Sequence, residues 1–181
     1  MYKQIEVQDM VRVPPEQFSD DIDQAIITSI KQKYEGHISR DLGIVIDVID
    51  VKDRAEGVVV PGDGAAYYEL SFNLLVFKPE IQEIIFARVR DIADFGAFLD
   101  LGAIDGMIHI GQTMDDFVTY SKEKVLTGKN SNRVLRVGDL VRARIVALSY
   151  KDLSNPRIGL TMRQAGLGRL EWVEDDLAEK K

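Results

Sequence analysis

The sequence contains no cysteine and only two histidines, His37 and His109. The lack of cysteine excludes disulfide bonds, thiolate chemistry and cysteine-based zinc sites, and two histidines are too few for a histidine metal site. No run of about 18 apolar residues occurs, so we expect no membrane-spanning helix. The first ten residues also lack the long apolar run of a secretory signal. We therefore expect a cytoplasmic protein that needs no metal or cofactor.

Basic residues are few overall, 23 against 30 acidic ones, and the net charge is −7. The deficit is uneven along the chain. Residues 1–80 hold 15 acidic and 8 basic residues, residues 81–165 hold 10 and 12, and residues 166–181 hold 5 and 3. Such asymmetry suggests modules with different partners. We predict one domain over 1–80, a second over 81–165, and an acidic C-terminal tail over 166–181.

The first domain reads as one long helix on a small antiparallel sheet. Lys3–Val13 alternates loosely and predicts a strand, which Pro14 and Pro15 end. Glu16–Tyr34 carries apolar residues at helical spacing, with acids near its start and lysines near its end, as suits the helix dipole. Leu42–Lys52 and Ala66–Lys78 read as further strands. The predicted class is α+β.

A hydrophobic run precedes a tight turn in this domain, and we call the seven residues the tip loop. They are Val58, Val59, Val60, Pro61, Gly62, Asp63 and Gly64. Pro-Gly and Asp-Gly pairs mark a turn. The valines are either an ordinary buried strand end or a hydrophobic tip that docks onto another protein.

The second domain shows five short strands with no long helix between them. They are expected at Glu80–Asp91, Phe95–Leu101, Ile104–Ile110, Val134–Tyr150 and Arg157–Arg163. This pattern predicts an all-β, five-stranded barrel of the OB type.

Two aromatic residues, Phe95 and Phe98, open the second of these strands, with Gly96 between them, and His109 closes the third. Two interpretations are open. Phenylalanine is often buried, so the pair could be core. On a small barrel, however, aromatic side chains are also the usual means of stacking the bases of a single strand.

Catalytic motifs are not recognisable. Gly62-Asp63-Gly64 lacks the third glycine and the following helix of a dinucleotide fingerprint, and Gly128-Lys129 lacks the upstream glycine of a phosphate-binding loop. No carboxylate stands in a recognisable order with a nucleophile or base.

Five motifs in the second domain follow the order and spacing of the ribosomal S-one RNA-binding domain, which this region resembles. They are Ala87-Arg88-Val89, Phe95-Gly96-Ala97-Phe98, Gly106-Met107-Ile108-His109-Ile110, the run Val137-Gly138-Asp139 with Val141 and Ala143, and Arg157-Ile158-Gly159-Leu160-Thr161 with Arg163. The resemblance implies a five-stranded OB barrel that binds single-stranded RNA at Phe95, Phe98, His109 and Arg157. Ser149 stands near a position where that family often has aspartate, and Gly111–Arg136 is a longer insertion.

Basic residues gather in the insertion and in the fourth strand: Lys122, Lys124, Lys129, Arg133, Arg136, Arg142 and Arg144. Such a patch can follow a nucleic-acid backbone electrostatically. We include Arg142, Arg144 and Lys129 among the RNA-binding residues. The alternative is a solvated surface loop.

The whole chain, to about Arg169, resembles the seventh-subunit family of RNA polymerases, known in archaea as the E-prime subunit. The opening strand with paired prolines and helix, the Gly62-Asp63-Gly64 turn and the run from Phe72 to Pro79 carry the resemblance, together with the barrel motifs. It implies an RNP-like tip domain that docks the polymerase core, with the tip loop as the docking element.

The resemblance also implies a non-catalytic stalk subunit that forms a heterodimer with the F subunit of RNA polymerase. In that family the barrel contacts emerging transcript, and the stalk assists promoter opening and processivity. Residues Leu167–Asp176 are then expected to add contacts to the F subunit, or else to form a frayed amphipathic tail.

Two other functions stay open from the residues alone. The barrel could serve a stand-alone RNA-binding module in translation or RNA decay. Alternatively, carboxylates of the acidic first domain could support metal-dependent RNA cleavage.

Overall fold

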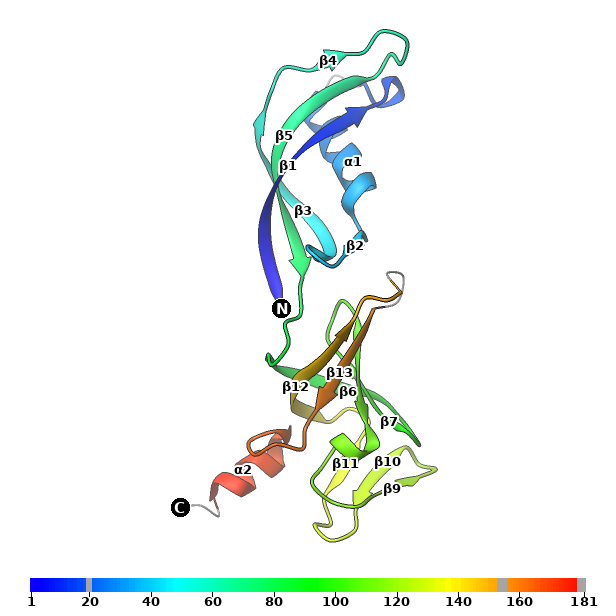
Figure 1. Cartoon of the computed structure of the whole chain (residues 1–181), viewed down its shortest axis with the longest axis vertical. Helices are drawn as coiled ribbons and strands as arrows, with labels where there is room; N and C mark the ends of the chain where they lie inside the picture. Colours follow the sequence, from blue (N-terminus) through cyan, green and yellow to red (C-terminus); the bar gives the residue numbers. More distant parts are fainter. Residues whose placement is uncertain (19–20, 153–155, 179–181) are drawn as a thin grey trace. The chain divides into compact units, whose positions relative to one another are not determined.

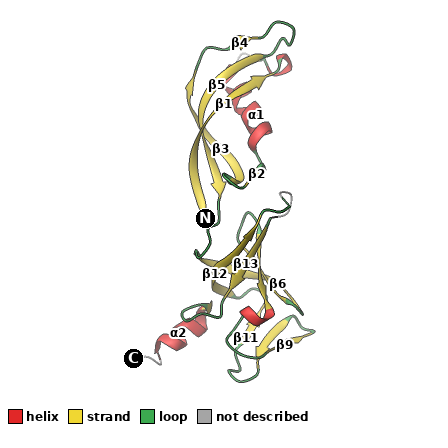
Figure 2. Cartoon of the chain, viewed as in Figure 1, coloured by secondary structure: helices red, strands yellow, loops and turns green. Residues whose placement is uncertain are grey.

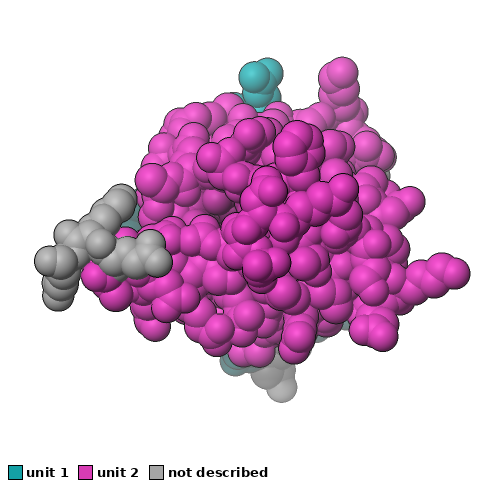
Figure 3. Space-filling model, turned by 90° about the horizontal axis from the view of Figure 1, so that it is seen from below, with its two compact units in different colours: residues 1–78 teal, residues 79–181 magenta. Residues whose placement is uncertain are grey.

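The computed structural model describes residues 1–18, 21–152 and 156–178. The chain divides into two compact units, Met1–Lys78 and Pro79–Lys181 (Figure 3). Neither helix in the described part of the chain is long and apolar enough to cross a membrane.

Unit 1 contains strands β1 to β5 and helix α1, which are labelled in Figure 1. Their bounds are β1 Tyr2–Val13, a 3₁₀ turn Pro15–Gln17, α1 Ile22–Tyr34, β2 Ile38–Ser39, β3 Gly43–Arg54, β4 Val58–Val59 and β5 Ala66–Phe77. The antiparallel sheet has the order β1-β5-β3-β2, and β4 adds to β5.

The core of unit 1 lies between α1 and this sheet. Helix α1 buries Ala25, Ile26 and Ile30 against β1 and β3. Opposite it, alternate side chains of the central strand, including Phe72 and Leu74, are fully buried. Alternate side chains of β5 therefore place one face of the strand under the helix, and the α+β prediction is confirmed.

The predicted helix begins later than its apolar spacing suggested. Phe18 has an extended backbone, with ψ at 107°, and ends the 3₁₀ turn that follows Pro14. Helix α1 then starts after Asp21, whose side chain accepts hydrogen bonds from the backbone N–H groups of Asp23 and Gln24. This N-cap satisfies donors that a helix start otherwise leaves open.

Unit 2 contains the barrel, a small added sheet and a terminal helix (Figure 2). The bounds are β6 Ile84–Ala93, β7 Gly96–Asp100, β8 Asp105–His109, a 3₁₀ turn η2 Ile110–Gln112, β9 Val118–Ser121, β10 Val125–Gly128, β11 Val134–Arg136, β12 Leu140–Ser149, β13 Arg157–Thr161, β14 Gly168–Arg169 and α2 Leu170–Ala178.

Five of these strands close the barrel. The order is β13-β8-β7-β6-β12, and β12 pairs with β13 to complete the ring. Strands β8 and β13 run parallel, whereas the other neighbours in the ring are antiparallel. Inward side chains such as Ile85, Leu99 and Ile108 are at most 2% exposed. The predicted five-stranded OB-type barrel is confirmed.

Two segments differ from the loop and tail that the sequence suggested. The insertion folds into the antiparallel sheet β9-β10-β11, with Leu126 and Leu135 fully buried beneath it. The expected acidic tail continues unit 2: it pairs with β12 through β14 and forms α2. In α2, Trp172 and Val173 are buried, whereas contacts of Leu167–Asp176 with the F subunit stay a prediction.

Candidate nucleic-acid interface

A groove of about 740 Å³ lies on the outer surface of the barrel, where β7, β8, β13 and the end of β12 meet. We call it the aromatic groove. The side chains that carry its chemistry are Phe95, Phe98, Met107, His109, Val146 and Arg157. Four of these were predicted as RNA-binding residues, and the barrel brings those four together.

The two phenylalanines lie outside the barrel core. On β7, Ala97 and Leu99 point inward and are fully buried, so Phe98 points outward and is half-buried. Phe95 precedes the strand and is 47% exposed. The two rings meet edge to face, with centroids 5.8 Å apart and planes at 87°. The interpretation of the pair as core is therefore wrong.

Gly96 allows this geometry because strand β8 passes close to its backbone. A Cβ atom at this position would lie 2.0 Å from the carbonyl oxygen of Ile108. That oxygen belongs to the strand paired with β7, so it cannot move without disturbing the ladder. A residue with a Cβ atom does not fit at position 96 unless β8 shifts, so only glycine allows β7 and β8 to lie this close.

Replacing Gly96 by alanine is accordingly expected to lower the free energy of unfolding by about 1–3 kcal/mol, as for other overpacked sites. Urea denaturation followed by circular dichroism measures the change. Gly111→Ala is the control, because its Cβ would meet no atom closer than 3.6 Å. An unaltered urea midpoint in Gly96→Ala would contradict the close approach.

His109 and Arg157 supply the polar side of the groove. The Nδ1 atom of His109 accepts a hydrogen bond of 3.2 Å from the backbone N–H of Gly111, which leaves Nε2 as the nitrogen that can donate to a ligand. Arg157 is exposed at the start of β13. The acidic Asp105 at the same groove is paired with Arg90 Nη1 at 2.8 Å, which offsets its repulsion of phosphate.

The other three predicted RNA-binding residues lie outside the aromatic groove. Arg142 donates to the carbonyl of Gly166 at 3.2 Å, and its guanidinium lies 5.0 Å from the centroid of the Phe86 ring. Arg144 donates to Gln82 at 3.4 Å. Both side chains lie on the outer face of β12, beside β6. Lys129 belongs to the turn after β10, in the added sheet.

Sequence reasoning missed Met107 and Val146 as groove residues, and it noted Ser149 only as standing near a position where the family often has aspartate. Met107 alternates outward on β8, a signal that the sequence does contain. Val146 faces outward in the same alternation as Arg142 and Arg144. Ser149 reaches the groove because β12 has an irregularity between Ile145 and Ala147 where it pairs with β13. A bulge of this kind changes which side chains face outward, and no local residue pattern announces it.

The tip loop of unit 1 is exposed and is held by a charged clamp. Val58, Val59 and Val60 are 63%, 59% and 43% exposed, so the interpretation as a buried strand end is wrong. Arg12 donates through Nε and Nη2 to the two carboxylate oxygens of Asp63 at 2.9 and 2.7 Å. Such two-point pairing fixes geometry as well as charge.

The clamp persists over a wide pH range. The Arg12 hydrogen bonds, with one from the Tyr67 hydroxyl at 2.7 Å, lower the pKa of Asp63 to about 2. Asp63 is thus ionised at all pH values well above 2. Gly62 and Gly64 have φ values of +96° and +69°, which favour glycine. The loop presents its valines from a preorganised turn.

Comparison with known proteins agrees with both halves of this description. The family model of the SHS2 domain found in the N terminus of Rpb7p/Rpc25p/MJ0397 matches residues 8–64, and the S1 RNA binding domain matches residues 78–154. The first match covers α1, β2, β3, β4, the tip loop and the second half of β1, and it ends before β5. The second covers the barrel strands from β6 to β12.

Two archaeal relatives match this chain along both of its units. DNA-directed RNA polymerase subunit Rpo7 of Saccharolobus solfataricus is 38% identical over 96% of this chain and 97% of its own length. Rpo7 of Sulfolobus acidocaldarius is 35% identical over 99% and 98%. Subunit RPC8 of RNA polymerase III from Bos taurus is 24% identical over 85% and 79%. The chain therefore belongs to the Rpo7 family of DNA-directed RNA polymerase subunits.

Proposed function

We propose that this subunit binds emerging single-stranded RNA in the aromatic groove while the tip loop attaches it to the polymerase core. The observation that carries the proposal is the edge-to-face pair of the exposed Phe95 and the half-buried Phe98, beside His109 and Arg157 in one groove. The subunit has no catalytic role of its own in this proposal. It acts in the cytoplasm as part of a stalk that assists promoter opening and processivity.

The groove offers the two interactions that single-strand binding needs. An exposed phenylalanine ring can stack on any base, at about 1–3 kcal/mol per base. Arg157 can pair with a phosphate or stack on a base, and the Nε2 atom of His109 can donate a hydrogen bond. Since none of these contacts reads a full base edge, we expect tolerance of sequence.

The tip loop suits attachment to a protein rather than to RNA. Its three valines are exposed, and the unit that bears them has a net negative charge, which disfavours RNA. Asp63 also pairs with Arg12, so this arginine is not available for a phosphate. We also propose pairing with the F subunit of the polymerase. Support for such a partner comes from exposed apolar side chains on the adjacent strands β6 and β12, namely Ile84, Phe86 and Leu140, since contiguous exposed apolar residues mark interaction surfaces.

RNA binding is expected to weaken with salt. If Arg157 and Lys129 both meet phosphates, log K should fall with log salt at a slope of roughly −1.4. Arg142 and Arg144 are not counted, because they lie beside Phe86 and Ile84 on the surface proposed for the F subunit. Fluorescence anisotropy with labelled RNA between 50 and 300 mM KCl measures this slope. An affinity that does not change over that range would contradict phosphate contacts. A loss of salt dependence in Arg157→Gln alone would confine them to the groove.

A further inference from the structure

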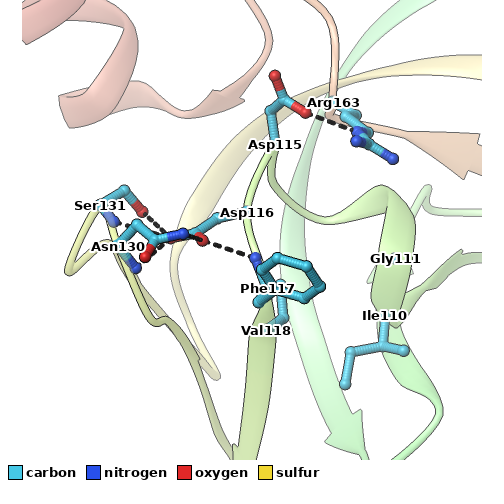
Figure 4. A pocket seen from close by; sticks show the side chains of 9 residues that line it. All are labelled: Ile110, Gly111, Asp115, Asp116, Phe117, Val118, Asn130, Ser131 and Arg163. Atoms are coloured by element: carbon cyan, nitrogen blue, oxygen red, sulfur yellow. Dashed lines mark hydrogen bonds and ion pairs between the residues drawn. The ribbon is translucent and has the colours of Figure 1, made fainter.

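A second hollow borders the aromatic groove on unit 2, with a volume of about 690 Å³ (Figure 4). Its walls come from η2, from the segment between η2 and β9, from the turn after β10, and from the end of β13. We call it the Phe117 pocket. Figure 4 shows the Asp115–Arg163 ion pair at one side of it, apart from the cluster of Asp116 with Asn130 and Ser131.

Phe117 is the most exposed of the large hydrophobic side chains in the described residues, at 76%. Its backbone is nevertheless held from both sides. The N–H of Phe117 donates to Asp116 at 2.6 Å, and its carbonyl accepts from the N–H of Lys129 at 2.9 Å. A bare aromatic ring on an anchored backbone loses little entropy when it meets a ligand.

Asp116 anchors the wall rather than serving as a ligand. Besides Phe117, it accepts hydrogen bonds from the backbone and side chain of both Asn130 and Ser131, at 2.7 to 2.9 Å. These bonds, first of all the one from the Ser131 backbone, lower the pKa of Asp116 to about 2. The carboxylate is thus ionised and occupied, and it joins the Phe117 segment to the turn after β10.

The chemistry of the pocket fits a nucleobase better than a phosphate. Asp115 and Asp116 disfavour an anion deep in the pocket, whereas a ring can stack on Phe117 without a charge. Arg163 pairs with Asp115 through Nε at 2.8 Å, and its guanidinium carries further N–H donors for a base edge. Lys129, which adjoins Phe117 through the backbone hydrogen bond, supplies a cation for the phosphate that follows such a base.

Two elements join this pocket to the aromatic groove. In and beside the short turn η2, His109 and Gln112 line the groove while Ile110 and Gly111 line the pocket. Strand β13 begins with Arg157 at the groove, and Arg163 at the pocket follows its end.

The two elements are also bound to each other. The carbonyl of Gln112 accepts from the N–H of Met162 at 2.8 Å, and its side chain accepts from the hydroxyl of Thr161 at 2.7 Å. These bonds tie η2 to the end of β13 between groove and pocket, so an RNA strand that crosses here meets hydrogen-bonded segments rather than a free loop.

We propose that the Phe117 pocket is a second nucleobase site, which binds a base of the same RNA strand beyond the aromatic groove by stacking on Phe117. This inference rests on the proposed function, and it lengthens the RNA path across η2. It also gives Lys129, which lies outside the groove, a place on that path. OB folds bind about 4–16 nucleotides, so a path longer than the groove is within their range.

The test compares RNA lengths. Anisotropy measures the affinity of the full chain for oligouridines of 4, 6, 8, 12 and 16 nucleotides, with wild type, Phe95→Ala, Phe117→Ala, Phe117→Trp and Tyr120→Ala. Tyr120 is the matched control, an exposed aromatic residue of strand β9, just after Phe117, that does not line the pocket. We expect Phe117→Ala to lose about 5- to 20-fold in affinity for the longer RNAs and almost none for the shortest, with Phe117→Trp close to wild type.

The outcomes separate the two claims. If Phe95→Ala weakens all lengths while Phe117→Ala behaves like Tyr120→Ala at every length, the pocket is not a base site and the groove proposal stands. If neither Phe95→Ala nor Phe117→Ala changes RNA affinity, the groove proposal itself fails, and this inference with it. If Phe117→Ala leaves RNA binding unchanged but weakens assembly with the other polymerase subunits, the pocket holds protein and the inference is overturned.

Discussion

A double variant with Phe95→Ala and Phe98→Ala should bind single-stranded RNA at least about 30-fold more weakly than wild type, with the barrel still folded. Each stacked base contributes about 1–3 kcal/mol, and 1.4 kcal/mol is tenfold in affinity. The barrel should survive because Phe95 is 47% exposed and Phe98 is half-buried, while the inward neighbours Ala97 and Leu99 are unchanged. Anisotropy with a 12-nucleotide RNA measures affinity, and thermal denaturation checks the fold.

Phe18→Ala is the matched control for this variant, since Phe18 is 50% exposed but lies in unit 1. It should leave RNA affinity unchanged. Phe95→Trp should restore most of the binding lost in Phe95→Ala, because stacking needs a ring rather than a particular one. A collapse of the melting temperature in proportion to the loss of binding would mean that the rings act as core after all.

Placing aspartates at Val58 and Val59 is expected to abolish stable incorporation of the subunit into the polymerase while leaving its own fold intact. The two side chains are 63% and 59% exposed, so the charges cost little in the free subunit. In an interface they would bury two unpaired carboxylates, which is unfavourable by several kcal/mol. Affinity for the core should fall by at least about 30-fold, the scale of a hot-spot substitution. Reconstitution with core enzyme followed by gel filtration measures it.

Val137→Asp is the control for residue type and exposure, since Val137 is 46% exposed and lies in unit 2. It should incorporate normally if attachment depends on the tip loop. Equal loss of incorporation in Val137→Asp would show that any added charge disturbs assembly. Full incorporation of the tip-loop variant would contradict the docking role.

The barrel was predictable because its strands alternate over a closed surface. In β12, Val141, Ala143 and Ile145 are fully buried, as their spacing indicated, and the arginines between them point outward. The same reasoning predicted a strand over Ala66–Lys78, which the structure has as β5, Ala66–Phe77. Where one face of an element packs on a core and the other meets water, the spacing of apolar residues in the sequence predicts the element and its buried face.

Other features depend on contacts between distant residues, which no local pattern records. The parallel pairing of β8 with β13 brings His109 and Arg157 to one groove across almost 50 residues of chain. The insertion looked like a basic loop because only its two buried leucines, Leu126 and Leu135, mark the sheet within it. Helix α2 looked like an acidic tail, yet Trp172 packs under Arg133, with 5.6 Å between guanidinium and ring centroid.

The central claim is that the aromatic groove holds the transcript while the subunit is attached to the polymerase. A photo-crosslinking amino acid at position 95 of the subunit, in reconstituted polymerase elongating a labelled RNA, tests it most directly, with the same amino acid at position 18 as the control. We predict that the label transfers to the subunit at position 95 once the transcript has left the enzyme, and not at position 18. Equal or absent transfer at the two positions, in polymerase shown to contain the subunit, would contradict the account.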